Sequence, residues 1–102
     1  MAILASIDSE SVFKFKGESH RLFIEGRGFD FERLIVDSNA NAELILPISD
    51  DNLYTFLDFE EPRVIYVVSR VGIKDLILQG CIIQEIRGNT CIFSYSKLQS
   101  ES

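Results

Sequence analysis

Few side chains in this 102-residue sequence could act as a nucleophile, a general base or a metal ligand. His20 is the only histidine, and Cys81 and Cys91 are the only cysteines. These three residues cannot supply the four convergent ligands of a zinc site, and both cysteines lie in apolar runs that would keep a thiol protonated. We therefore interpret His20 as a surface residue and the cysteines as core residues. The sequence predicts no catalytic residue, no metal site, no cofactor and no enzymatic activity.

The two glycines of Gly26-Arg27-Gly28 have a spacing that also occurs in phosphate-binding loops. Neither a dinucleotide fingerprint nor a P-loop lysine follows them, and no change from strand to helix surrounds them. We interpret the segment as a turn between two strands.

The strongest charge feature is an acidic segment, residues 50–61, which contains five carboxylates and no basic residue. Apolar residues interrupt the carboxylates, so the alternating oxygen ligands of a calcium loop are absent. A solvated face is one interpretation, and a protein-contact surface with aromatic anchors is the functional one. The predicted contact residues are Asp50, Asp51, Tyr54, Asp58, Phe59, Glu60 and Glu61.

The whole chain is acidic, with sixteen acids, ten bases and a net charge of −6. Such a charge repels phosphate backbones and anionic lipids, so we expect neither nucleic acid nor membrane as a partner. The amino terminus has no basic leader, and no run of apolar residues reaches the length of a membrane span. Together with cysteines that are not expected to pair, this predicts a cytoplasmic protein.

The elements that would position these residues are mostly β-strands in one domain, residues 1–102. β-Branched and aromatic residues dominate residues 63–70, and apolar residues on both sides of residues 64–68 predict burial of both faces. Residues 76–86 continue as a long strand in which Gly80 predicts a bulge or bend.

Gly88-Asn89 is the clearest turn signal, because both residues tolerate the positive φ of a two-residue hairpin. This turn predicts that Ile86 lies opposite Cys91 and that Cys81 points to the opposite face, which excludes a disulfide. The full predicted register pairs Arg87 with Thr90, Ile86 with Cys91, Gln84 with Phe93 and Ile82 with Tyr95.

Earlier segments alternate apolar and polar residues and read as further strands, at residues 2–7, 12–16, 20–25, 29–36 and 42–48. A helix competes for residues 31–36, and Pro47 predicts an edge strand or a strand end. The one helix predicted is residues 51–59, with an extended conformation of residues 54–59 as the alternative.

Residues 37–95 end in a glycine-centred strand and an aromatic strand, and in this they resemble a PilZ domain, the cyclic-dinucleotide receptor family. The resemblance implies ligand recognition by paired arginines and a D-x-S-x-x-G motif. Residues 37–42 lack the serine and the glycine at the motif positions, and no matching arginine pair precedes them. No ligand-binding residue is therefore assigned.

These features predict a mainly antiparallel β fold, either a barrel or a two-layer sandwich or roll, with one short α-helix. The expected function is a non-enzymatic protein-interaction module, an adaptor or inhibitor whose acidic surface meets a basic partner. The alternative is a small-ligand-binding β-barrel with a pocket near Gly80 and the Gly26-Arg27-Gly28 turn. Apolar residues on the more polar face of the long strand, Ile77 and Ile83, also make a homodimer plausible.

Overall fold

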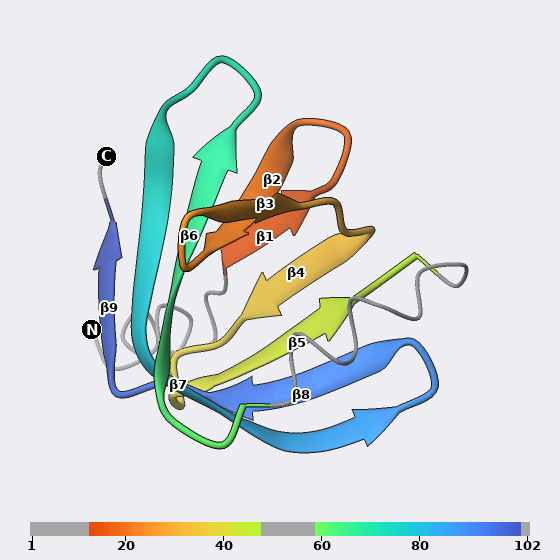
Figure 1. Ribbon diagram of the computed structural model, residues 1–102, viewed down its shortest axis with the longest axis vertical. Helices are drawn as coiled ribbons and strands as arrows, with labels where there is room; N and C mark the ends of the chain where they lie inside the picture. The colour runs from red at the N-terminus through yellow and green to blue at the C-terminus, as the bar shows by residue number, and fades with distance from the viewer. Residues whose placement is uncertain (1–12, 48–58, 101–102) are drawn as a thin grey trace, which may run out of the picture.

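The computed structural model describes residues 13–47 and 59–100, and all regular structure in them is β-strand (Figure 1). In this described part of the chain nine antiparallel strands form one sheet, which confirms the predicted mainly antiparallel β fold. The predicted strand at residues 2–7, and the predicted helix apart from Phe59, lie outside the described residues and stay predictions. The strands are β1 (Phe13–Lys16), β2 (His20–Ile24), β3 (Arg27–Phe29), β4 (Arg33–Val36), β5 (Asn41–Ile45), β6 (Arg63–Ser69), β7 (Lys74–Arg87), β8 (Thr90–Ser94) and β9 (Lys97–Ser100).

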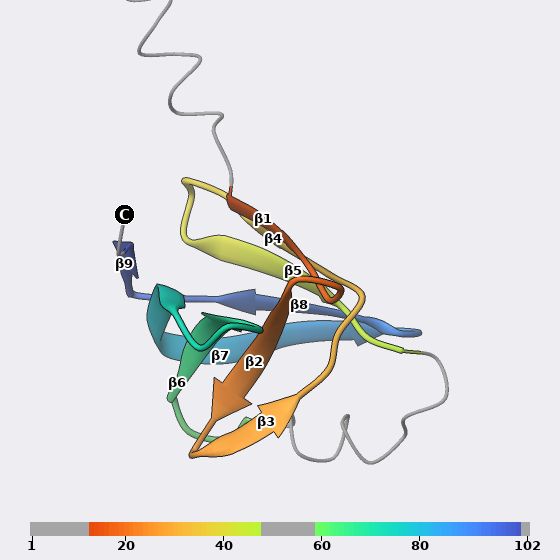
Figure 2. The same cartoon turned by 90° about the horizontal axis from the view of Figure 1, so that it is seen from above.

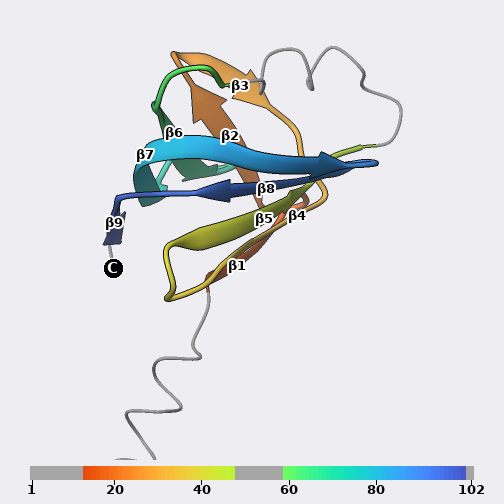
Figure 3. The ribbon, with the colours of Figure 1, turned by 90° about the horizontal axis from the view of Figure 1, so that it is seen from below.

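The strands follow one open path through the sheet. Their order is β1-β4-β5-β8-β7-β6-β2-β3, with β9 added beside β7, and Figures 2 and 3 show this succession from two sides. Within the described residues the end strands β1 and β3 do not pair with each other, so the sheet is not closed into a barrel.

Strand β7 belongs to both parts of this path. Residues 74–79 pair with β6 and β9, whereas residues 82–87 turn away and pair with β8 (Figure 1). We call β1, β4, β5, β8 and the end of β7 half A, and β2, β3, β6, β9 and the start of β7 half B.

Gly80 permits the bend in β7 that joins the two halves. Its φ is +67°, in the left-handed region that favours glycine, and an added Cβ would collide with the Ser96 side chain. The pairing of β7 with β6 also shifts here, between Ile65 and Arg63. The predicted bend at Gly80 is therefore confirmed.

The residues that point inward from both halves form one hydrophobic core. Leu34 and Leu44 of half A and Ile65 and Leu78 of half B are at most 1% exposed. Burying each such side chain stabilises the fold by about 1.5–3 kcal/mol. The side chains that alternate with them point outward and form two surfaces, which we call face A and face B after their halves.

Strand β6 is covered on one side only. Ile65 and Val67 point into the core, whereas Val64 is 38% exposed on face B. The predicted burial of both faces is wrong, because among the described residues half A covers only the inward side of β6.

The tip of the β7–β8 hairpin follows the predicted register. The turn is Gly88-Asn89, with φ +61° at Gly88, and Arg87 lies opposite Thr90 and Ile86 opposite Cys91. Glycine suits such a turn because it adopts a positive φ without steric cost.

Further from the turn the predicted register is wrong, because a bulge at Gln84 adds one residue to β7. Phe93 lies opposite Ile83 instead of Gln84, and Ile82 lies opposite Ser94 instead of Tyr95. A shift of one residue moves side chains to the other face, so the two irregularities at Gln84 and Gly80 change the predicted orientation of the residues between them.

The two cysteines consequently share one environment. Cys81 and Cys91 are both free, both 0% exposed and both part of the core. The prediction that they pack as small buried residues is confirmed, and the prediction that they point to opposite faces is wrong.

Two other local predictions change in detail. Glu25 and Gly26, with φ of 53° and 81°, form the turn after β2, so Arg27 already belongs to β3. Strand β5 ends at Ile45, before Pro47 as expected, but it pairs with β4 and β8 and is not an edge strand. Strand β4 replaces the competing helix.

Candidate functional site

The charge of the chain is unevenly divided between the described residues and the rest. Residues 13–47 and 59–100 contain all ten basic residues and ten of the sixteen acids, so the sheet is neutral overall. The six surplus acids fall in residues 1–12, 48–58 and 101–102. The net charge of the chain therefore does not describe the sheet surface, and one face of the sheet can be basic.

Most of the predicted acidic contact surface lies outside the described residues. Glu60 and Glu61 are exposed, whereas Phe59 is 6% exposed, belongs to the core and lies against the Arg63 guanidinium. Phe59 thus packs the core, and the contact surface as a whole stays a prediction. The residues outside the description are Asp50, Asp51, Tyr54 and Asp58.

Face A is the outward surface of β1, β4, β5 and β8. Strand register arranges its residues in rows that cross the strands, because directly opposite residues of an antiparallel pair project to the same side. One row begins with Lys16 opposite Arg33, and the next begins with Lys14 opposite Ile35. The main residues of face A are Lys14, Lys16, Arg33, Ile35, Glu43, Ile45 and Ile92.

Two basic side chains face each other at one end of face A. Lys16 and Arg33 are direct cross-strand neighbours, and Lys14 is the next outward residue of β1. Among the described residues, no carboxylate lies within salt-bridge distance of these three side chains. Like charges directly opposite in a sheet are destabilising, so an anion bound here would remove a repulsion that the fold itself leaves.

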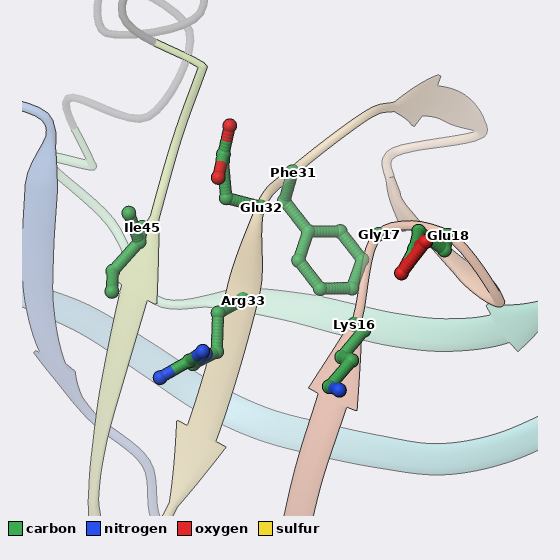
Figure 4. A pocket seen from close by; sticks show the side chains of 7 residues that line it. All are labelled: Lys16, Gly17, Glu18, Phe31, Glu32, Arg33 and Ile45. Atoms are coloured by element: carbon green, nitrogen blue, oxygen red, sulfur yellow. The ribbon is translucent and has the colours of Figure 1, made fainter.

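A pocket of about 660 Å³ opens beside this basic pair (Figure 4). In Figure 4, Lys16 and Arg33 extend to one side of the pocket and Glu32 extends to the other, with the Phe31 ring between. Ile45 contributes an apolar wall. The pocket therefore has a basic side and an acidic side.

Gly17 holds together the two chain segments that line this pocket. Its N–H donates to the Glu32 carbonyl at 3.1 Å, and an added Cβ would overlap the Phe31 carbonyl oxygen. The Gly17 carbonyl accepts two hydrogen bonds from the Arg70 guanidinium, at 2.7 and 3.2 Å. These contacts fix the β1–β2 turn against the connection before β4, so the pocket is formed before any ligand arrives.

Two hollows of about 250 Å³ each continue the pocket across face A. One shares Lys16 and Arg33 with the pocket, and the other joins the first at Ile35 and extends to Ile92. We call these adjoining hollows one shallow depression. Ile35, Ile45 and Ile92 supply its apolar surface, and Glu43 lies between Ile35 and Ile92 in the cross-strand row.

The β4–β5 turn at the border of this depression is held by its own hydrogen bonds. The Asp37 carboxylate accepts from the N–H groups of Asn39 and Asn41 at 2.8 and 3.0 Å, and the Tyr95 hydroxyl donates to the Asp37 carbonyl at 2.5 Å. Burial, and secondly the Asp37 charge, raise the pKa of Tyr95. The hydroxyl therefore remains a protonated donor at neutral pH.

His20 belongs to a chain of hydrogen bonds that the sequence did not reveal. Its Nδ1 lies 2.8 Å from the Ser19 hydroxyl, and its Nε2 lies 2.6 Å from a carboxylate oxygen of Asp75. The Phe15 ring packs edge-on against the imidazole, with ring centroids 4.8 Å apart. The Asp75 carboxylate can only accept a hydrogen bond, so Nε2 donates to it.

Hydrolytic triads have the same order of hydroxyl, imidazole and carboxylate. Ser19, however, lies in the β1–β2 turn, where its N–H and its hydroxyl also reach the Lys16 carbonyl at 3.1 and 3.3 Å. The pocket and hollows of face A are lined by other residues than Ser19, His20 and Asp75. We assign this chain of bonds to the fold, because it ties the β1–β2 turn to the start of β7.

The His20 side chain is 15% exposed, so the predicted surface histidine is wrong. Asp75 follows His20 by 55 positions, and only the pairing of β2, β6 and β7 brings the two together.

The remaining reactive groups are protonated or dispersed. Burial raises the pKa of Cys81 to about 12 and that of Cys91 to about 11, so neither thiol is an effective nucleophile at neutral pH. In the part of the chain that the structure describes, no group of three or more His, Cys, Asp or Glu side chains could hold a metal ion.

The two glycine sites of the predicted ligand pocket lie apart from face A. The Ser96 side chain occupies the space beside Gly80. Next to Gly26 a separate hollow of about 440 Å³ is lined by residues that include Arg63, Val64 and Tyr66.

Comparisons of the chain with protein-family models, with curated proteins and with solved structures find no match. The described residues contain no helix with the length and apolar character needed to cross a bilayer. The geometry of the sheet surfaces is therefore the ground on which a function can be argued.

Proposed function

We propose that the protein is a non-enzymatic protein-interaction module that binds an acidic, partly apolar segment of a partner protein on face A. The observation that carries the proposal is the opposed pair Lys16 and Arg33, with Lys14 beside it, at the border of a depression that Ile35 and Ile45 help to line. Carboxylates of the partner would relieve the repulsion between these cations, and its apolar side chains would cover Ile35 and Ile45.

The free energies involved require both ionic and apolar contacts with the partner. A hydrogen bond to a charged group contributes about 1.5–3 kcal/mol, and burying one leucine-sized side chain contributes a similar amount. Association costs about 4–15 kcal/mol in lost freedom of motion, so a few ionic contacts alone would not hold a partner. The isoleucines of the depression then supply affinity, whereas the cations supply selectivity and a faster association.

The proposal is tested with a phage-displayed library of random linear peptides selected on the full-length protein. We expect the selected peptides to combine Asp or Glu with apolar residues, and their binding to weaken as salt rises above about 0.15 M. Reversing two charges on face A, Lys16→Glu with Arg33→Glu, should weaken the best peptide by about tenfold or more, because each lost charge-assisted bond is worth about 1.5–3 kcal/mol.

A matched control reverses two charges on the other face, Lys74→Glu with Lys97→Glu, and should leave peptide binding unchanged. Equal losses in both variants would show a non-specific charge effect and contradict the proposal. Selected peptides without acids would contradict it as well.

The pocket in Figure 4 favours one further candidate, a small anion held by Lys16 and Arg33, which corresponds to the ligand-binding alternative. Titration with citrate or phosphate, followed by NMR, separates the two candidates. Saturable shifts confined to Lys16, Gly17 and Arg33, without selection of any peptide, would favour the small anion.

The non-enzymatic part of the proposal is tested at Ser19. A fluorophosphonate probe labels a serine that a histidine activates, and we expect no labelling of the native protein beyond that of a Ser19→Ala variant. Labelling of Ser19 that is lost in His20→Gln would show an activated nucleophile instead.

We also propose that the protein works in a reducing compartment such as the cytoplasm. Its support is that both cysteines are free in the core, where oxidation would disturb packing. Fractionation of the cells that produce the protein, followed by immunoblotting, tests this directly.

A further inference from the structure

Face B has a different chemistry from face A. Its outward residues come from β2, β6, β9 and the start of β7, and Phe23 lies opposite Tyr66, which lies opposite Ile77. Two aromatic rings are therefore neighbours at the centre of this face. The other outward residues are Arg21, Val64, Val68, Lys74, Gln79, Lys97 and Gln99.

Three cations project from the strands of face B, and the nearby acids Asp30, Glu25 and Asp75 each have a side-chain partner. Arg21 forms an ion pair with Asp30 at 3.2 Å, so Lys74 and Lys97 carry the unbalanced charge. In the part of the chain that the structure describes, neither lysine has a carboxylate within salt-bridge distance. The Lys74 ammonium lies 5.0 Å from the centroid of the Tyr66 ring, so charge and ring occupy one site.

A hollow of about 440 Å³ adjoins this site. Tyr66 and Val64 form one side of it, and Pro62 and Gly26 form another. Among the described residues one acid lines it, Glu25, and Glu25 is paired with Arg63. The hollow thus offers an aromatic wall to a planar group without an uncompensated negative charge.

An occupant of face B must supply negative charge for the lysines and flat apolar surface for the rings. A second copy of the chain does not fit, because in a two-fold contact each B face would meet another face with the same two lysines that lack a partner in the described residues. A single nucleic-acid strand supplies both features, since phosphates and unpaired bases alternate along it. We infer that face B binds single-stranded nucleic acid, with a base stacked near Tyr66 and phosphates beside Lys74 and Lys97.

The acidity of the whole chain predicts the opposite, and the division of charge explains the difference. The six surplus acids lie outside the described residues, whose own net charge is zero. Within the described residues Lys74 and Lys97 have no ion-pair partner, so these two cations are available to a phosphate.

The test is fluorescence anisotropy of labelled oligothymidylate and oligouridylate with the full-length protein at several salt concentrations. Two phosphate contacts predict that the logarithm of the affinity falls with the logarithm of salt with a slope of about −1.4. Tyr66→Leu should weaken binding by about fivefold to a hundredfold, because it removes stacking and keeps an apolar side chain. Tyr66→Phe keeps the ring and should bind normally.

Lys74→Gln with Lys97→Gln should bring the salt slope close to zero, whereas the matched change on face A, Lys14→Gln with Lys16→Gln, should leave it unchanged. The inference is overturned if wild type shows no salt-dependent binding, if the face A variant loses as much as the face B variant, or if duplex of the same sequence binds better. Equal competition by polyglutamate would overturn it in favour of an acidic polypeptide. Unchanged melting temperatures of the variants confirm that each one is folded.

Discussion

Faces A and B are the outward surfaces of one sheet, yet they offer different chemistry. Face A is hollowed and carries isoleucines together with acids and bases, whereas face B places two aromatic rings among bases and amides. Both faces arise from the alternation of side chains along the strands, because every second side chain points into the core and the others point outward. The difference shows that the net charge of a chain says little about any one face of its fold.

The two faces are separate on the surface and joined inside. Strand β7 contributes to both halves, and its bend at Gly80 directs the two outward surfaces apart. A change on one face should therefore leave the other intact, whereas a change in the shared core should disturb both. This contrast gives the following expectations.

The largest effect should come from the core. Leu44→Ala in half A and Leu78→Ala in half B each remove a side chain that is at most 1% exposed, and each should lower the free energy of unfolding by about 2–5 kcal/mol. Urea unfolding followed by circular dichroism and by NMR should show one transition for both halves. Two separate transitions would mean that the halves are independent units and that a shared core is the wrong description.

Gly80→Ala should be the next most damaging change. The positive φ costs a residue with a Cβ about 1–3 kcal/mol, and the collision with Ser96 adds to it. The double variant Gly80→Ala with Ser96→Gly should recover the stability lost to the collision with Ser96. It should not recover the stability lost to the positive φ, and urea unfolding measures both. Wild-type stability of Gly80→Ala alone would contradict a required left-handed conformation at the bend.

Features that depend on neighbouring residues could be predicted from the sequence. The alternation of Phe13 to Lys16, the β-branched run of β6 and the Gly88-Asn89 turn all act over a few residues, and each is where the sequence places it. The bulge at Gln84 could not be predicted, because glutamine has no backbone preference that marks it. One extra residue there was enough to shift the predicted pairing of β7 with β8 by one position.

The candidate sites depend on contacts between distant segments and were largely hidden. Lys16 and Arg33 oppose each other only because β1 pairs with β4, and Lys97 reaches face B only because β9 pairs with β7. Phe59 shows the converse, since its acidic neighbours predict an exposed anchor while the fold buries it. In all three cases the surroundings of the residue follow from its position in the sheet, which no short sequence pattern encodes.

Alkaline pH should reveal a smaller difference between the thiols of the two halves. The unfolded chain titrates its thiols near pH 9, whereas burial raises the pKa of Cys81 to about 12 and that of Cys91 to about 11. The folded state therefore holds these protons more tightly, and the stability they contribute is full below pH 9 and is lost as pH rises above it. The loss amounts to about 1.4 kcal/mol per pH unit for one thiol.

Removing each thiol separates the two contributions. Cys81→Ala should flatten the decline in unfolding free energy up to about pH 12, and Cys91→Ala only up to about pH 11, as measured by urea unfolding at a series of pH values. Identical profiles for both variants and wild type would show that other groups control the alkaline transition.

The smallest effect should come from relieving the repulsion on face A. Arg33→Gln removes one of two opposed cations, and Lys16 then has no like charge directly across the strand, so the free energy of unfolding should rise by about 0.2–1 kcal/mol. Lys97→Gln on face B is the matched control, because Lys97 lies opposite the neutral Gln79 and its removal should change stability little. High salt should abolish the gain in Arg33→Gln, since it screens the repulsion in wild type. A loss of stability in Arg33→Gln would mean that the guanidinium holds the fold together, and face A would then have no destabilising charge for a partner to neutralise.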